Sequence, residues 1–98
     1  MALKIKWTKR AANSFDKTVK YLQTEWNLSS AQRFVKRSNK FLQTLVQYPR
    51  IGKIQNSEKE IRAYVLSRHI SVFYRIKSDQ LILLKFFNNR QNPSKRPN

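Results

Sequence analysis

The first 26 residues predict a strand followed by a helix. Residues 3–7 alternate between apolar side chains and lysines, the two-residue period of a strand that buries one face. Thr8 follows and can cap a helix, because its hydroxyl can accept from a free backbone N–H of the first turn. The helix is expected to bury one stripe of apolar residues spaced three or four apart: Ala11, Phe15, Val19, Leu22 and Trp26.

The next segment predicts a second helix with two different sides. Asn27 and Leu28 interrupt the apolar period, and Ser29 and Ser30 offer hydroxyls that can cap a helix from about residue 31 to residue 47. The expected buried stripe is Phe34, Ser38, Phe41, Leu42 and Leu45. The opposite side carries four cations, Arg33, Lys36, Arg37 and Lys40.

The second half of the chain predicts an antiparallel sheet. Pro49 disfavours helical geometry at Tyr48, and Gly52 allows a turn, so a loop is expected to continue to about Lys59. Three strand-like runs follow at 61–66, 70–77 and 80–87, joined by short connections. The last run is apolar on both faces, so either it lies inside the sheet or a partner covers one side.

These elements predict an α+β fold in the order β-α-α-β-β-β. Two amphipathic helices would pack on one face of a mainly antiparallel four-stranded sheet. We expect one domain at residues 1–90 and a polar, basic C-terminal tail at residues 91–98, because the tail contains no apolar residue.

Charge dominates the composition. Among 98 residues, 21 are Lys or Arg and 5 are Asp or Glu, which gives a net charge of +16. Self-repulsion of this size opposes compaction and favours a polyanionic partner, namely nucleic acid, an acidic protein or an anionic membrane. The membrane is disfavoured, because the second helix needs its apolar residues for the core. No apolar run exceeds four residues, so we expect a cytoplasmic protein without an export signal.

The residue counts exclude several kinds of site. The chain has no Cys and one Gly, which removes thiolate chemistry and a glycine-rich nucleotide loop, and its one His cannot serve both a catalytic triad and a metal. Its five scattered carboxylates are too few for a metal cage, so we expect neither metal nor cofactor. His69 is interpreted as a turn residue beside Arg68, although an imidazole is also suited to act as a general base.

A long segment without acidic residues is the strongest local charge signal. No Asp or Glu occurs from Trp26 to Ser57. Two interpretations stay open: a solvated helix face, or a surface that docks phosphates or carboxylates. The candidate residues for binding a target or nucleic acid are Arg33, Lys36, Arg37, Lys40, Arg50 and Arg68.

The strands add candidates for phosphate chemistry. Arg62 and Arg75 lie among apolar strand residues, and a guanidinium fork suits phosphate or carboxylate oxygens. Metal-independent cleavage of a phosphodiester also needs an acid and a base. The local candidates for those roles are Glu58, Glu60, Tyr64, His69 and Tyr74, and Tyr74 is equally well explained by packing in the sheet.

The chain resembles the RelE/ParE toxins of type II toxin–antitoxin modules, also described as plasmid stabilisation proteins. The resemblance covers nearly the whole chain and rests on the order and spacing of short, degenerate motifs. These are Trp7-Thr8 before the first helix, Tyr48-Pro49-Arg50-Ile51-Gly52 after the second, Ile61-Arg62, the run Ile70-Ser71-Val72-Phe73-Tyr74-Arg75-Ile76, and Arg90-Gln91-Asn92-Pro93.

The resemblance implies a toxin that a cognate antitoxin keeps inactive through an acidic, apolar C-terminal segment, and a pair that binds operator DNA chiefly through the antitoxin. A protein of charge +16 with a doubly apolar last strand is consistent with such a partner. The residues expected to contact the antitoxin are Leu83, Phe86, Phe87 and Arg90.

The resemblance also implies one of two targets, DNA gyrase for ParE-like members and messenger RNA on the ribosome for RelE-like members. An RNase would use a metal-independent constellation of Lys53, Arg62, His69, Arg75 and Arg90. The sequence departs from the RNase pattern, because Leu66 occupies the place of an expected Arg and no Tyr or His follows Tyr74. We therefore prefer a toxin that acts by binding gyrase, and keep the RNase and a non-toxic nucleic-acid-binding module as alternatives.

Overall fold

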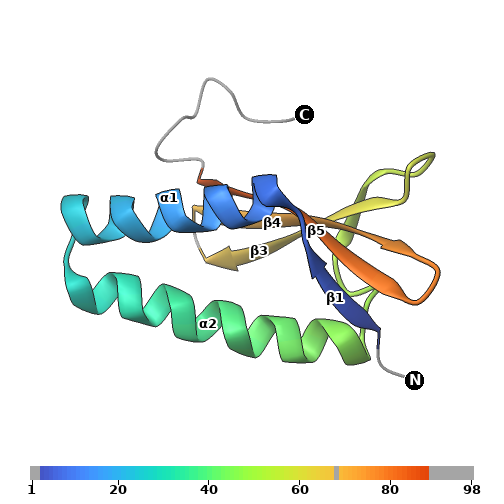
Figure 1. The fold of residues 1–98 in the computed structure, drawn as a ribbon, viewed down its shortest axis with the longest axis horizontal. Coiled ribbons are helices and arrows are strands. Elements are labelled where there is room, and N and C mark those ends of the chain that lie inside the picture. Colours follow the sequence, from blue (N-terminus) through green and yellow to red (C-terminus); the bar gives the residue numbers. More distant parts are fainter. Residues whose placement is uncertain (1–2, 68, 89–98) are drawn as a thin grey trace.

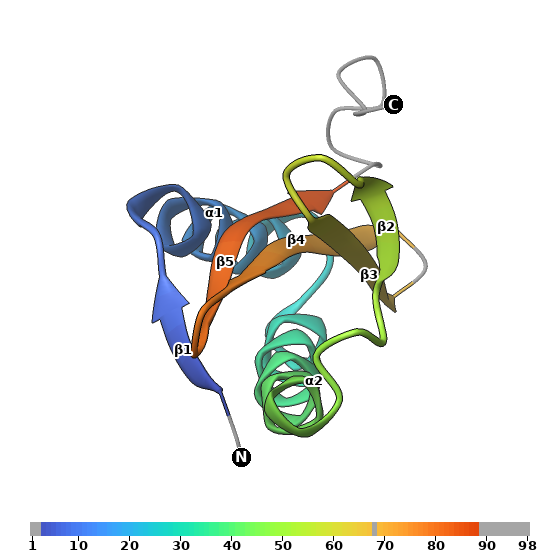
Figure 2. The same ribbon diagram turned by 90° about the vertical axis from the view of Figure 1, so that its right-hand side faces the viewer.

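The fold is a five-stranded mixed sheet with two long helices on one face, seen in a computed structural model that describes residues 3–67 and 69–88. Neighbouring strands follow the order β1-β5-β4-β3-β2, and all pairs are antiparallel except β1 with β5. Figures 1 and 2 show the helical hairpin lying along the sheet. The elements are β1 (Lys4–Trp7), α1 (Lys9–Glu25), α2 (Leu28–Gln47), β2 (Lys53–Asn56), β3 (Ile61–Ser67), β4 (Ile70–Lys77) and β5 (Gln80–Asn88).

The predicted fold class is confirmed, but the sheet has a fifth strand. β2 lies inside the segment expected to be a loop up to Lys59, and it pairs with the start of β3. All four of its residues are exposed, so backbone pairing rather than burial stabilises this edge strand. It therefore lacks the alternation of apolar and polar residues by which the other strands were predicted.

The helix starts agree with the prediction in one case and differ in the other. Thr8 caps α1, because its hydroxyl accepts from the Ala11 N–H at 3.1 Å. The prediction for α2 was wrong by three residues, since the helix begins at Leu28. Its cap is Asn27, whose side-chain oxygen accepts from the Ser30 N–H at 2.8 Å, so the serine hydroxyls are not the cap.

The core lies between the helices and one face of the sheet. Both predicted helix stripes supply it, with Ala11 from α1 and Phe34, Phe41 and Leu45 from α2 all buried. The prediction was wrong for Trp26, which follows the last turn of α1 as its C-cap and is 53% exposed. Trp7 is 40% exposed, yet its ring packs on Phe15 and Phe86 with centroids 5.5 and 5.7 Å away. Such edge-to-face and stacked pairs fix the start of α1 over the sheet.

β5 is an inner strand, which accounts for its two apolar faces without a partner protein. It lies between β1 and β4. The pairing with β4 shifts by one residue at Leu84, so this residue forms a bulge that reverses the alternation. Leu83 and Phe86 consequently both face the helices, whereas Lys85 and Phe87 lie on the opposite face.

Where β1 ends, hydroxyl groups of Thr8 and Ser14 take over the hydrogen bonds to the backbone of β5. The Thr8 hydroxyl donates to the Leu83 carbonyl at 2.7 Å, and the Phe86 N–H donates to the Ser14 hydroxyl at 2.8 Å. These bonds satisfy backbone groups that a strand would otherwise pair. The first turns of α1 thereby cover the part of β5 that β1, which ends at Trp7, does not pair with.

A polar junction joins the end of α2 to the middle of the sheet. The buried Tyr74 hydroxyl donates to the Pro49 carbonyl and accepts from the Gly52 N–H, each at 2.8 Å. The Arg62 guanidinium donates to the carbonyl oxygens of Gly52 and Arg50 at 2.9 and 3.3 Å. This Tyr74 junction fixes the path from α2 into β2.

We expect Gly52→Ala to lower the free energy of unfolding by about 1–3 kcal/mol, the usual cost of overpacking. A Cβ at this position would lie 2.5 Å from the Tyr74 hydroxyl and 3.0 Å from the Ala63 carbonyl oxygen. Urea unfolding monitored by tryptophan fluorescence measures the change. Lys53→Ala, one residue away and exposed, should stay within about 0.5 kcal/mol. Equal stability of the Gly52 variant and the natural protein would contradict this packing.

We expect Tyr74→Phe to cost about 1–3 kcal/mol, because two buried backbone groups lose their partner. Burial is the main cause that raises the pKa of Tyr74 above its ordinary value. The unfolded chain then ionises first, so the stabilisation is complete below about pH 10 and is lost as pH rises through the higher folded pKa. Unfolding curves from pH 7 to 11 should show the two proteins converging at high pH. A constant difference would refute this account.

Candidate functional site

The four cations of α2 line two different hollows. Arg33, Arg37 and Lys40 line cavities between α2 and the strands β3 and β4. Lys36 lies on the other side of the helix, in a cavity of about 380 Å³ between α1 and α2. The predicted cationic side of the helix is thus split by the way in which α2 sits on the sheet.

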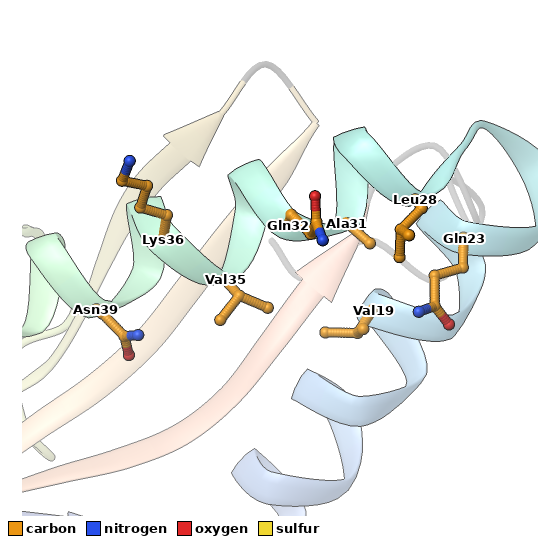
Figure 3. A pocket seen from close by; sticks show the side chains of 8 residues that line it. All are labelled: Val19, Gln23, Leu28, Ala31, Gln32, Val35, Lys36 and Asn39. Carbon is orange, nitrogen blue, oxygen red and sulfur yellow. The ribbon is translucent and has the colours of Figure 1, made fainter.

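The cavity between the helices has an apolar floor and few charges. Figure 3 shows Val19 of α1 facing Val35 of α2, with Leu28 and Ala31 beside them and Lys36 and Asn39 at one end. Lys36 is the one charged side chain among the described lining residues. Among the described residues that line this cavity, none is acidic and none is a histidine.

Arg62, predicted as a catalytic cation, has a structural position. It pairs with Tyr74 across the sheet, so it lies on the helix-facing side. Its guanidinium donates to two carbonyl oxygens of the loop after α2. Arg50, predicted to bind a target, is exposed in the same loop and supplies one of these carbonyls.

Lys53 and Arg75 lie on the face of the sheet turned away from the helices, which we call the outer face. Their register neighbours Ala63, Ile61 and Ile82 share that face. The Nε of Arg75 is buried and has no hydrogen-bond partner among the described residues. The two cations therefore lie on one surface, separated from Arg62 by the sheet.

Lys85 is a third cation of the outer face, and the sequence analysis did not name it. Its Nζ lies 4.9 Å from the Phe87 ring centroid and 5.8 Å from that of Phe73. The pKa of Lys85 is lowered, mainly by burial and secondly by the positive charge of Arg10. The bulge at Leu84 places Lys85 here, and the hydropathy pattern contains no signal for a bulge.

His69 lies in the turn after β3, as predicted, and lines a cavity of about 410 Å³ at the end of the sheet. Arg33 and Arg37 line the same cavity, together with the aromatic residues Tyr21 and Trp26. Arg68, a predicted binding residue, lies outside the described residues. So does Arg90, which was predicted for both catalysis and antitoxin contact.

The residues expected to contact an antitoxin are buried within the chain itself. Leu83, Phe86 and Phe87 are 0%, 4% and 9% exposed. Leu83 and Phe86 belong to the core against the helices. Their apolar character is therefore explained by folding, and these three side chains present little surface to another protein in this structure.

Of the five predicted RNase residues, the four that the structure describes do not lie at one place. Lys53 and Arg75 lie on the outer face, Arg62 lies under the helices, and His69 lies at the end cavity. Tyr74, a candidate acid or base, is buried in the junction, where its hydroxyl already donates one hydrogen bond and accepts another. Arg90 lies outside the part of the chain that the structure describes.

Within residues 3–67 and 69–88, no three side chains of His, Cys, Asp or Glu come together as ligands for a metal ion. In the same ranges, neither helix has the length and apolar character needed to cross a membrane.

Comparisons with solved structures identify the fold. The toxin–antitoxin structure described as the chromosomal ParDE system of P. aeruginosa is similar with a TM-score of 0.73 and 19% identity, over 89% of this chain and 96% of that chain. The YoeB/ParE toxin from Agrobacterium tumefaciens has a TM-score of 0.66 and 13% identity, over 88% and 98%. The RelBE2 toxin–antitoxin complex from Mycobacterium tuberculosis has a TM-score of 0.65 and 15% identity, over 90% and 99%.

Comparison with curated protein sequences gives no match. A family model matches residues 5–93, which is nearly the whole chain. That model describes the ParE toxin of the type II toxin–antitoxin system parDE. The five-stranded sheet and helical hairpin agree with the similar structures. The chain therefore belongs to the ParE toxin family of type II toxin–antitoxin systems.

Proposed function

We propose that this toxin arrests growth by binding a protein target, of which DNA gyrase is the first candidate, and that a cognate antitoxin neutralises it. The observation that carries the proposal is the separation of the RNase candidates. The Arg62 guanidinium is hydrogen-bonded to carbonyl oxygens on the helix-facing side of the sheet. His69 lies in the turn after β3 and lines the end cavity, whereas Lys53 pairs with Ala63 nearer the start of β3. General acid–base cleavage needs its groups within hydrogen-bond reach of one reacting phosphate.

The surface supports a binding role. No ion pair joins the described residues, so most of the 21 cations are available to attract an acidic surface. The structures of ParDE and RelBE2 are of toxins with their antitoxins. We extend that partnership to this chain, because its net charge of +16 favours a polyanionic partner and an acidic antitoxin is one such partner.

One observation favours a second candidate, cleavage of RNA. The outer face carries Lys53, Arg75 and Lys85, and Lys85 lies near the rings of Phe73 and Phe87. Cations next to aromatic rings are typical of surfaces that bind single-stranded nucleic acid. Among the described residues this face has no His and no carboxylate of the strands to serve as acid or base, so it supports contact with a phosphate backbone better than its cleavage.

We expect purified toxin to inhibit supercoiling of a relaxed plasmid by DNA gyrase, and induced expression to arrest growth. A protein of charge +16 also coats DNA, so relaxation of the same plasmid by topoisomerase I is the control. Inhibition of gyrase alone, at physiological salt, is the expected result. Growth arrest together with unaltered supercoiling at saturating toxin would exclude gyrase. Equal inhibition of both enzymes would indicate DNA coating instead of a gyrase interaction.

A further inference from the structure

The turn out of α2 and the edge strand after it expose large apolar side chains. Tyr48, Ile51 and Ile54 are 63%, 46% and 51% exposed, and they lie close together in the sequence. None of the three belongs to the core of the described chain. Single exposed apolar side chains are common on protein surfaces, but a group of them is typical of an interaction site.

Hydrogen bonds and strand pairing bring the three residues together, and we call Tyr48, Ile51 and Ile54 the turn patch. Ile54 lies opposite Arg62 in the pairing of β2 with β3. The Arg62 guanidinium in turn donates to the Gly52 carbonyl at 2.9 Å. Ile54 therefore lies beside the turn that carries Tyr48 and Ile51, whose backbones are joined by a hydrogen bond of 3.1 Å. Figure 2 shows the chain leaving α2 here and entering β2 at the edge of the sheet.

The backbone of the turn patch is fixed by the rest of the fold. The Tyr48 N–H donates to the Thr44 carbonyl of α2 at 2.9 Å. The buried Tyr74 hydroxyl bonds to the Pro49 carbonyl and the Gly52 N–H, each at 2.8 Å. A partner that binds a backbone fixed in this way loses less conformational entropy to ordering. The turn is therefore suited to present anchor side chains to another molecule.

The border of the turn patch is cationic. Arg50 and Lys53 are exposed between its apolar residues, and no Asp or Glu occurs in the sequence from residue 26 to residue 57. The first carboxylates after that segment, on Glu58 and Glu60, lie in the turn between β2 and β3. A complementary surface would consist of an apolar centre bordered by carboxylates.

β2 adds a free strand edge beside the patch. It is the last strand of the sheet, so within the described ranges its outer edge pairs with no other strand. All of its residues, Lys53–Asn56, are exposed. Such an edge can hydrogen-bond to the main chain of another protein.

We propose that the turn patch is the surface by which this toxin contacts its protein target, on an apolar area of the target bordered by carboxylates. The inference rests on the proposed function, in which the toxin acts by binding a protein. Nucleic acid fits less well, because Ile51 and Ile54 offer no ring on which a base can stack. A second copy also fits less well, because each copy would bring the same cations, Arg50 and Lys53, to the contact.

Leu28 supplies a matched control. It is 58% exposed at the opposite end of α2, where it lines the cavity between the helices (Figure 3). Ile51→Asp and Leu28→Asp each place a carboxylate at an exposed apolar position and change the net charge by the same amount. Neither side chain belongs to the core, so both variants should fold, and melting curves check this.

Inhibition of supercoiling by purified gyrase is titrated with the natural toxin and both variants at physiological salt. We expect the toxin concentration for half-inhibition to rise at least about tenfold in Ile51→Asp, because loss of a central anchor commonly weakens an interface by that factor. In Leu28→Asp it should stay within about twofold. Equal inhibition by all three proteins, or an equal loss in both variants, would overturn the turn patch.

The chain has no Cys, so one introduced thiol can be labelled at a chosen position. Tyr48→Cys and Leu28→Cys are each labelled with a benzophenone maleimide and irradiated with purified gyrase. We expect toxin–gyrase crosslinks from position 48 and not from position 28. Equal yields from the two positions would contradict the proposal. Crosslinks from position 48 only to a second toxin molecule would show that the occupant is another copy, and the proposal would be wrong.

Growth arrest distinguishes failure of the turn patch from failure of the proposed function. At equal protein levels, the natural toxin and Leu28→Asp should arrest growth, whereas Ile51→Asp should not. Arrest by all three would refute the turn patch and leave the proposed function standing. No arrest by the natural toxin would refute the proposed function, and this inference with it. Arrest by the natural toxin without inhibition of supercoiling would refute gyrase as the target, and the Ile51→Asp strain would still decide whether the patch contacts the target.

Discussion

The hydroxyl of Tyr74 makes the contact on which the position of α2 depends. It bonds to the Pro49 carbonyl and the Gly52 N–H, which lie on either side of the turn out of the helix. A side chain from the middle of the sheet thereby fixes the end of α2, and Arg62 ties the same turn to β3. The helix is held here and along its buried stripe, and a cavity lined by Arg37 and Lys40 lies between it and β3.

The excess of cations explains why individual basic residues are stabilised by groups other than carboxylates. With 5 acidic residues against 21 basic ones, few countercharges are available inside the chain. Arg62 is stabilised by carbonyl oxygens instead, and Lys85 by the faces of two aromatic rings. Most of the other described cations lie at the surface, where their mutual repulsion opposes folding and binding of a polyanion would relieve it. Neutralisation by a partner and stability of the toxin are therefore linked.

The sequence was informative wherever burial is periodic. The stripes of both helices and the runs of β3, β4 and β5 follow the 3.6- and 2-residue periods, and apart from the exposed Trp26 at the end of α1 they lie where the pattern places them. β2 was missed because an exposed edge strand has no such period. The start of α2 was misplaced because Asn27, rather than a serine, supplies the cap.

The candidate site was less predictable, because it depends on contacts between distant segments. A helical projection groups Arg37 with Lys36, and only the position of α2 between α1 and the strands separates them into two cavities. Arg62 resembles a phosphate-binding residue in sequence, and its role becomes clear only from the carbonyl groups of a loop ten residues away. The bulge at Leu84 likewise moves Phe86 to the core side, so the alternation in β5 could not be extrapolated.

The central claim is that this toxin acts by binding and does not cut RNA. Primer extension on a messenger translated in vitro with purified ribosomes tests it most directly, with an established ribosome-dependent RNase as the positive control. The account predicts the same extension products with and without the toxin. Codon-phased ends that appear with the natural protein and disappear in Arg75→Ala would contradict it, and would place a nuclease site on the outer face.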